Sequence, residues 1–241
     1  MSSDIPDVSA PDQRRWRHIR SFVRREGRLT RGQQHAIDLL GPKFMLEFDQ
    51  QQLDFDALFG RQAPRYLEIG FGDGKALAEM AAASPEVDFV GIEVHRPGVG
   101  SLLQRVDAQS LTNVRVICAD VVEVLKTAFA DTTLDKAFMF FPDPWHKKRH
   151  HKRRLLQPDF AELLRSKLKP GGIFHMATDW EDYAMHMLAV MNAAPGFQNT
   201  AADQSFVMRP AYRPLTKFEA RGKRLGHGVW DLLFKRFDDD N

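Results

Sequence analysis

Short apolar runs that are typical of buried strands alternate five times with helical patterns between residues 66 and 192. A strand–helix alternation of this kind folds into a parallel sheet that helices cover on both faces. The predicted strands are Tyr66–Gly70, Asp88–Val94, Val114–Cys118, Lys136–Phe141 and Ile173–Ala177. The predicted helices are Lys75–Ala83, Gly98–Ala108, Val121–Ala128, Pro158–Leu168 and Tyr183–Asn192. The sequence therefore predicts an α/β domain with a doubly wound sheet.

Both ends of the chain depart from this alternation. Thr216–Leu225 and Val229–Phe237 flank Gly226-His227-Gly228, which predicts a closing hairpin and an antiparallel edge. Between Arg14 and Arg31 there are eight arginines and a single acid, and apolar residues recur there every three or four positions. We expect a short helix with a basic face for nucleic acid, and a solvated extension is the alternative. We divide the chain into a basic, partly disordered extension, 1–40, and a main domain, 41–241.

Composition limits the classes of protein that this chain can belong to. The single cysteine, Cys118, excludes an internal disulfide and suits a reducing compartment. Because it lies in a predicted strand, we interpret it as a small buried hydrophobe rather than a nucleophile. No window approaches 18 uncharged apolar residues, and the N-terminus lacks the apolar region of a signal peptide. We expect a cytoplasmic protein without a membrane span.

A glycine-rich loop follows the first predicted strand, with the order Glu68-Ile69-Gly70-Phe71-Gly72-Asp73-Gly74. Glycines such as Gly70 and Gly72 let the backbone turn sharply and approach a ligand closely. The spacing differs from the G-x-G-x-x-G of dinucleotide sites, and Glu68 would repel a pyrophosphate. S-adenosylmethionine, which carries an ammonium and a sulfonium, would tolerate that acid. A tight turn without a ligand is the alternative.

Two further acids end the next two predicted strands. Glu93 ends the second strand, where a carboxylate can accept hydrogen bonds from both hydroxyls of a ribose. Asp120 ends the third strand and can accept from an exocyclic amine or cap the following helix. Open α/β sheets bind ligands at the carboxyl ends of their strands. The conjunction of three acids at successive strand ends therefore favours a cofactor site.

The fourth predicted strand leads into Pro142-Asp143-Pro144-Trp145-His146 and then into a basic run. Two prolines hold Asp143 in a fixed, non-helical backbone, and Trp145 either stacks on a base or packs in the core. Six lysines and arginines lie within the eight residues 147–154, with no acid among them. Such a density favours a polyanion partner over a solvated loop. His146 and His150 have a zinc-like spacing, but their cationic flanks argue against a metal.

The run FFPDPWHKKRHHKRR and the tail RPLTKFEARGKRLGHGVWDL resemble the bacterial tRNA (guanine-N7)-methyltransferases, as do IRSFVRREGRLTRGQ and LEIGFGDG. The resemblance covers nearly all of the chain from about Ser21 onward. It implies a Rossmann-like class I methyltransferase, with a mostly parallel seven-stranded sheet, an antiparallel C-terminal hairpin strand and helices on both faces. It also implies methyl transfer from S-adenosylmethionine to N7 of a guanine in the tRNA variable loop, which gives 7-methylguanosine.

The resemblance also assigns roles to residues of this sequence. The acids that it places around the cofactor are Glu68, Glu93, Asp120 and Asp143, and Asp143 is also the catalytic residue. The residues that it places at the substrate are Lys147, Asp179, Thr216, Lys217, Phe218 and Glu219. The residues that it places against the RNA are Arg149, His150, His151, Lys152, Arg153 and Arg154. A helix cap remains the alternative for Asp179, and a paired surface acid the alternative for Glu219.

The implied chemistry requires no strong base, because guanine N7 has a free lone pair and loses no proton. The protein must mainly align the reacting atoms, and a carboxylate such as Asp143 can stabilise the positive charge of the methylated purine. Asp143-Pro144-Trp145 faintly resembles the motif of amino-group methyltransferases, which needs a second proline where Trp145 stands. A non-catalytic RNA-binding module is the other alternative. We expect tRNA as the partner, no metal, and a monomer, although the sequence does not determine the oligomeric state.

Overall fold

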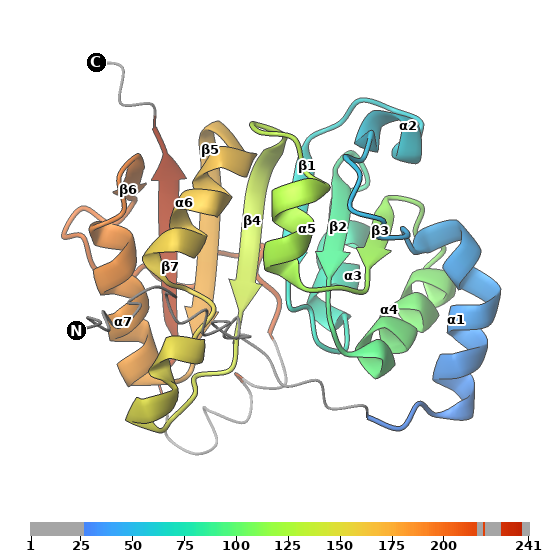
Figure 1. The fold of residues 1–241 in the computed structure, drawn as a ribbon, viewed down its shortest axis with the longest axis horizontal. Coiled ribbons are helices and arrows are strands. Elements are labelled where there is room, and N and C mark those ends of the chain that lie inside the picture. Colours follow the sequence, from blue (N-terminus) through green and yellow to red (C-terminus); the bar gives the residue numbers. More distant parts are fainter. Residues whose placement is uncertain (1–26, 216–218, 220–227, 238–241) are drawn as a thin grey trace, which may run out of the picture.

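A seven-stranded sheet in the order β3-β2-β1-β4-β5-β7-β6 forms the centre of the computed structural model (Figure 1). The structure describes residues 27–215, 219 and 228–237. The strands are β1 Arg65–Ile69, β2 Asp88–Ile92, β3 Val114–Ile117, β4 Leu134–Phe140, β5 Leu168–Thr178, β6 Phe197–Asn199 and β7 Trp230–Arg236. The helices are α1 Arg31–Phe44, α2 Phe55–Phe59, α3 Lys75–Ala83, α4 Arg96–Ala108, α5 Val121–Thr127, the 3-10 helix η1 Lys148–Arg153, α6 Pro158–Lys167 and α7 Glu181–Asn192.

The five predicted strands and five predicted helices are confirmed, and the main difference lies at the start of β5. β1 pairs in parallel with β2 and β4, β2 with β3, and β4 with β5. The register between β4 and β5 moves from the pair Leu134–Leu168 to the pair Lys136–Ile173. Residues 169–172 therefore form a bulge inside a strand that begins at Leu168 rather than at the predicted Ile173.

Helices cover both faces of the sheet, as Figure 1 shows. One buried cluster contains Val124 of α5, Leu164 of α6 and Met187 of α7. The second buried cluster contains Leu77 of α3 and side chains of α1 and α4. The predicted three-layer α/β architecture is therefore confirmed. The chain runs from β1 outward to β3 and then returns to β4 on the other side of β1, so the order of the strands reverses between β1 and β4.

The C-terminal strand β7 is antiparallel, as predicted, but its neighbours differ from the expected hairpin. One edge pairs with β5, from Trp230 opposite Thr178 to Lys235 opposite Ile173. The other edge pairs with β6 and with Val207, which lies opposite Asp231. Among the described residues, β5, β6 and Val207 pair with the two edges of β7. The expected hairpin partner was residues 216–225. Those residues lie outside the described part of the chain, apart from Glu219, which is helical.

Helix α1 crosses residue 40, where the sequence analysis divided the chain. Thr30 and Gln33 cap its N-terminus with reciprocal hydrogen bonds of 3.2 and 2.9 Å. The helix packs against α4 at Gly100, where an added Cβ would lie 2.7 Å from Cβ of Gln33. Its side chain Ile37 is buried. The predicted helix between Arg14 and Arg31 lies mostly outside the described residues. The division of the chain stays a proposal, and α1 favours a domain that begins near residue 30.

Candidate active site

Four acids occupy the carboxyl ends of four neighbouring strands. Glu68 lies near the end of β1, Glu93 follows β2, Asp120 follows β3 and Asp143 follows β4. The strand order β3-β2-β1-β4 makes these strands neighbours, and all four run in parallel. The acids therefore lie along one edge of the sheet, at the reversal of strand order where α/β proteins bind ligands.

The glycine-rich loop turns back on itself through three left-handed glycines. Gly70, Gly72 and Gly74 have φ values of +69°, +61° and +71°, a conformation that disfavours a side chain. An added Cβ would meet nothing within 4 Å at Gly70 or Gly72, whereas at Gly74 it would lie 2.5 Å from Cβ of Leu102. Gly70 and Gly72 thus present open backbone to a ligand. Gly74 is required for close packing of the loop on α4.

Gly98, in the first turn of α4, lies directly against this loop. An added Cβ would lie 2.0 Å from the carbonyl oxygen of Gly72. Alanine would otherwise favour a helix by about 1 kcal/mol. Because the clash forces the loop or the helix to move, we expect Gly98→Ala to destabilise the fold by about 1–3 kcal/mol. Denaturant titration measures this change, and we expect weaker binding of S-adenosylhomocysteine beside it.

The matched control for Gly98→Ala is Gln104→Ala, at an exposed position of the same helix. We expect Gln104→Ala to leave both stability and binding nearly unchanged, because surface substitutions typically change stability by only about 0.5 kcal/mol. Equal stability of the two variants would contradict the role of Gly98 in seating the glycine loop.

Three backbone N–H groups hold the carboxylate of Glu93. Gly72 N donates to Oε2 at 2.9 Å, while Val94 N and His95 N donate to Oε1 at 2.8 and 3.0 Å. These bonds tie the end of β2 to the glycine loop and fix the orientation of the carboxylate. A carboxylate offers about four lone-pair positions, so Glu93 retains capacity for a ribose hydroxyl. The predicted ribose contact stays a prediction.

Glu68 is the most strongly perturbed acid of the site. Its residue is 2% exposed, and its Oε2 atom is buried without a hydrogen-bond partner. Burial, then the negative charges of Glu93 and Asp73, raise the pKa of Glu68 from 4.5 to about 8. A buried carboxyl without a partner, beside two other acids, fits a cationic ligand group. The residues present therefore fit the ammonium-bearing part of S-adenosylmethionine.

The other two predicted pocket acids make local hydrogen bonds. Asp120 caps α5, where its Oδ1 accepts from Val122 N at 2.8 Å. The cap uses one carboxylate oxygen, so the helix-cap interpretation of Asp120 is confirmed and its contact with an adenine amine stays a prediction. Asp143 is exposed, and its Oδ1 accepts from Trp145 N at 2.9 Å. This bond closes the turn after β4, in which Phe141 and Trp145 have φ values of +53° and +47°.

The turn after β4 holds Trp145 against the basic run. The guanidinium of Arg153 lies over its ring, 5.0 Å from the centroid, and the ring of His150 meets it edge-on at 5.8 Å. Bulky residues adopt a positive φ only where the surroundings enforce it, and such residues cluster at functional sites. Trp145 is half-buried and its ring packs against Arg153 and His150, while stacking on a base stays a prediction.

The basic run forms η1 and presents an exposed cationic surface beside the β4 turn. Its exposed members are Lys147, Lys148, Arg149 and Lys152. Desolvation and then the positive charges of Arg149 and Arg153 lower the pKa of His150. Lysines and arginines therefore supply the positive charge of this surface at neutral pH, and His150 remains neutral.

Arg154 differs from the rest of the basic run because its side chain is 1% exposed. Its guanidinium pairs with Asp182, donates to the carbonyl oxygen of Pro144 at 3.0 Å, and lies 4.8 Å from the ring centroid of Tyr183. Because its Nε and Nη2 atoms bond within the protein, this buried guanidinium is directed to Pro144 and Asp182 rather than to solvent. We therefore withdraw Arg154 from the predicted RNA-contacting residues and assign it to the support of the β4 turn.

The predicted substrate residues fall into three groups. Lys147 is exposed at the start of η1. Asp179 follows β5, but helix α7 begins after Trp180 and has no side-chain cap, so the cap alternative for Asp179 is not realised. Thr216, Lys217 and Phe218 lie outside the described residues. Glu219 is 2% exposed, which excludes the alternative of a surface acid, and it accepts from Arg213 Nη1 at 2.7 Å.

A buried network that was not predicted from the sequence holds Glu219. Arg213, which is fully buried, also donates to both carboxylate oxygens of Asp231, at 2.6 and 2.9 Å. Asp231 in turn bonds with His175 Nε2 at 2.7 Å. A signal for this network was present, because Asp231 interrupts the apolar strand β7 and a buried acid requires a partner.

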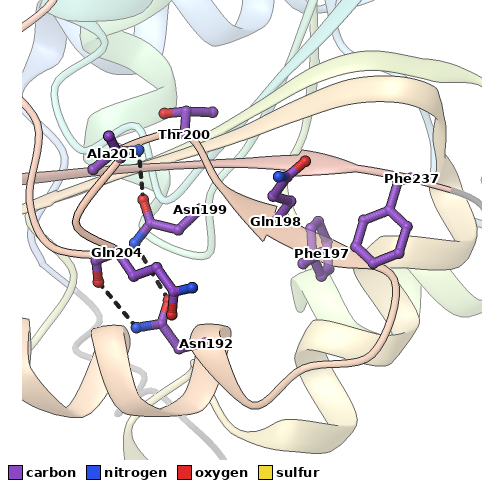
Figure 2. Close-up of a pocket in the computed structure, with 9 residues that line it drawn as sticks. Asn192, Phe197, Gln198, Asn199, Thr200, Ala201, Gln204 and Phe237 are labelled. Carbon is purple, nitrogen blue, oxygen red and sulfur yellow. Dashed lines mark hydrogen bonds between the residues drawn. The ribbon is translucent and has the colours of Figure 1, made fainter.

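A separate pocket of about 520 Å³ lies at the other end of the sheet, between α7 and β6 (Figure 2). Asn199 donates to Asn192 at 3.3 Å, and Asn192 donates to the carbonyl oxygen of Gln204 at 3.1 Å. Among the residues that the structure describes, no ionisable side chain lines the pocket. Strands β5 and β7 separate β6 from β4. The strand-end acids, rather than this pocket, form the candidate active site.

No helix in the described part of the chain is long and apolar enough to cross a membrane. Within the same residues, no three or more histidine, cysteine or acidic side chains are grouped to hold a metal ion.

Comparisons with known proteins identify close relatives. Residues 62–232 match a family model described as "Putative methyltransferase". The chain is 60% identical over 243 residues to the tRNA (guanine-N(7)-)-methyltransferase of Pseudomonas aeruginosa strain PAO1, covering 98% of this chain and 100% of the relative. It is also 60% identical over 237 residues to the protein of the same name from Pseudomonas putida strain F1, with 98% and 99% covered.

Two solved structures share the fold at low sequence identity. The 16S rRNA methyltransferase KamB has a TM-score of 0.55 at 14% identity, covering 81% of this chain and 99% of that chain. A tryptophan-to-alanine mutant of the 16S rRNA (adenine(1408)-N(1))-methyltransferase from Catenulisporales acidiphilia, solved with SAM, has a TM-score of 0.53 at 17% identity, with 81% and 95% covered. These likenesses support the predicted Rossmann-like class I methyltransferase fold.

Proposed function

This chain belongs to the tRNA (guanine-N(7)-)-methyltransferase family, and we propose that it transfers a methyl group from S-adenosylmethionine to N7 of a guanine in tRNA. The product is 7-methylguanosine, and we place the target in the variable loop. One observation of the structure carries the proposal. A site that fits a cationic cofactor lies at the same sheet edge as an exposed cationic surface, and the β4 turn joins them. We further propose that the protein acts in the cytoplasm, on its proposed tRNA substrate.

The cofactor-binding residues in this proposal are Glu68, Gly70, Gly72, Glu93, Asp120 and Asp143. Bound S-adenosylmethionine supplies an electrophilic methyl group. Glu68 provides a carboxylate for the ammonium, and the open glycines Gly70 and Gly72 allow the ligand to approach the backbone closely. Glu93 presents a carboxylate that three N–H groups hold in place. These roles require no metal and no strong base.

Asp143 is the catalytic residue in this proposal. The attacking N7 atom uses its lone pair and loses no proton, so the purine becomes positively charged as the methyl group is transferred. The carboxylate of Asp143 stabilises that developing charge, an effect that is strongest where the charged group is held in place beforehand. Its hydrogen bond to Trp145 N provides this preorganisation. Lys147, Asp179 and Glu219 orient the guanine beside it.

In this proposal, the exposed part of the basic run binds the RNA backbone. The candidate active site at the strand ends recognises the base. The proposed contacts are Arg149, His150, His151, Lys152 and Arg153. The guanine must leave its stack to reach the site, which costs roughly a few kcal/mol and less for a loop base. The sheet edge thus selects an exposed guanine of a folded RNA.

We expect the double variant Arg149→Gln/Lys152→Gln to bind tRNA more weakly. Each lost phosphate contact should reduce the slope of log affinity against log salt by about 1. Titrations of tRNA at several salt concentrations measure this slope. The control is Lys126→Gln/Lys235→Gln, which removes two exposed charges on α5 and β7. Equal slopes for the two double variants would contradict η1 as the RNA contact.

The direct test of the proposed function is methyl transfer with a defined product. The purified protein is incubated with labelled S-adenosylmethionine and unmodified tRNA transcripts, and the modified nucleoside is then identified. Labelled 7-methylguanosine in the variable loop supports the proposal. A different methylated nucleoside overturns the proposed chemistry while leaving the cofactor assignment in place. The absence of transfer, with cofactor binding intact, overturns tRNA as the sufficient substrate.

A further inference from the structure

Arg213 occupies the centre of a fully buried ionic network. Its Nε and Nη2 atoms donate to the two oxygens of Asp231 at 2.6 and 2.9 Å, and its Nη1 donates to Glu219 Oε2 at 2.7 Å. Arg213 is 0% exposed, and both acids are 2% exposed. A planar guanidinium that engages one carboxylate with two N–H groups fixes direction as well as distance. The third donor therefore holds Glu219 in one orientation relative to β7.

The network also fixes Asp231 from its other side. His175 Nε2 lies 2.7 Å from Asp231 Oδ1, and the hydroxyl of Tyr212 lies 3.0 Å from His175 Nδ1. Burial, opposed by the bond to Asp231, lowers the pKa of His175, so the ring is neutral at pH 7. A neutral ring then donates from Nε2 to Asp231 and accepts from the Tyr212 hydroxyl at Nδ1. Asp231 is thereby a fixed anchor for Arg213.

Arg213 also contacts the strand that leads to Asp143. Its guanidinium carbon lies 5.9 Å from the ring centroid of Phe140 and 5.6 Å from that of Phe141. Phe140 ends β4, and Phe141 has a φ of +53° two residues before Asp143. The side chain of Arg213 thus contacts the end of β4, the strand that leads to the proposed catalytic acid. The same side chain holds Glu219, a proposed substrate residue.

We propose that Arg213 is a positioning residue for methyl transfer. It holds the carboxylate of Glu219 in place relative to the end of β4, which leads to Asp143. This inference rests on the proposed function. Arg213 touches neither the substrate nor the cofactor in this scheme and acts through the carboxylate of Glu219. Lysine keeps the charge but lacks the planar fork, so it cannot bond both acids in the same geometry. A misplacement of about 1 Å can reduce a rate by about a hundredfold.

The test is a double-mutant cycle on methyl transfer, with Arg213→Lys, Glu219→Gln and the combined variant. We expect each single variant to lower kcat for tRNA by about a hundredfold, with the KM for tRNA and the affinity for S-adenosylhomocysteine within a few-fold of the unmodified protein. The combined variant should lose no more than either single variant, because both changes remove one interaction. Glu219→Asp keeps the Arg213–Asp231 pair and should lower kcat similarly.

The control is Arg209→Lys, an exposed arginine that donates to the carbonyl oxygen of Arg213 at 2.9 Å. We expect it to leave kcat unchanged. The proposal is overturned if the losses in kcat of the two single variants multiply in the combined variant. It is also overturned if kcat falls only because cofactor binding is lost. If Arg213→Lys fails to fold, full activity of Glu219→Asp overturns it instead. An unmodified protein that transfers no methyl group to tRNA contradicts the proposed function, whereas an active one with multiplicative losses contradicts only the role of Arg213.

Discussion

An Asp143→Asn variant is expected to lose roughly 10²–10³-fold in the rate of methyl transfer while it keeps the fold of the β4 turn. The reason lies in the two functions of this carboxylate. Its Oδ1 atom accepts from Trp145 N at 2.9 Å and so closes the turn. In the proposed function, its negative charge stabilises the positive charge that develops on the purine. Asparagine keeps an oxygen for the turn and removes the charge.

Asp143→Ala removes both functions and completes the comparison. Single-turnover transfer to unmodified tRNA measures the rate, and binding of S-adenosylhomocysteine reports the integrity of the pocket. We expect both variants to lose the rate and Asp143→Ala alone to lose thermal stability, since Trp145 holds a φ of +47° that the hydrogen bond supports. Full turnover of Asp143→Asn beside an inactive Asp143→Ala would reduce Asp143 to a turn residue.

The fold was predictable because each strand and helix carries its own local signal. Apolar strands such as Phe89–Ile92 lie in a sheet covered on both faces, so they are apolar throughout. Stops such as Ser84-Pro85 end the helices between them. Local signals did not predict which strands pair when the partners lie far apart in the sequence. Only the whole sheet brings residues 197–199 to the edge of β7, and no local signal marks this pairing.

The sequence predicted which residue types form the candidate site and at which strand ends they lie. It predicted the contacts of the individual side chains less well. The sequence places Arg154 in an unbroken cationic run, yet burial beside Asp182 and Tyr183 separates it from its neighbours. Nothing local marks that difference, because Asp182 lies 28 positions away. Likewise, Glu68 and Glu93 appear as similar pocket acids. The folded chain bonds Glu93 to three N–H groups and leaves Glu68 Oε2 without a partner.

From this difference we predict that Glu68 makes cofactor binding depend on pH. Burial and the charges of Glu93 and Asp73 raise its pKa to about 8, so the carboxyl is mostly protonated at pH 7 in the free protein. An ammonium group favours the ionised carboxylate, and binding must therefore release a proton. We expect the affinity for S-adenosylhomocysteine to rise by up to about tenfold between pH 6 and pH 7, where the ligand's amino group stays protonated.

Glu68→Gln removes the titrating group and keeps nearly the same shape. We expect this variant to bind the ligand about ten- to a hundredfold more weakly at pH 7, because a hydrogen bond to a charged group contributes about 1.5–3 kcal/mol. Its affinity should also be independent of pH over the same range. Calorimetric titrations in two buffers of different ionisation enthalpy count the released protons. Proton release by the glutamine variant equal to that of the unmodified protein would assign the titration to another group.

The same raised pKa predicts how the stability of the free protein depends on pH. A carboxyl whose pKa is higher in the folded state than in the unfolded state contributes stability that is fully present below pH 4.5 and is lost as pH rises through about 8. Over that window the Glu68 carboxyl ionises in the unfolded state but stays protonated in the folded state, which favours unfolding, whereas Glu68→Gln has no such group. We therefore expect Glu68→Gln to become progressively more stable than the unmodified protein between pH 5 and pH 8. A stability difference that stays constant across this range would contradict a buried, protonated Glu68. Glu68 thus lowers the stability of the free protein as pH rises, and a bound cationic cofactor would stabilise its ionised form.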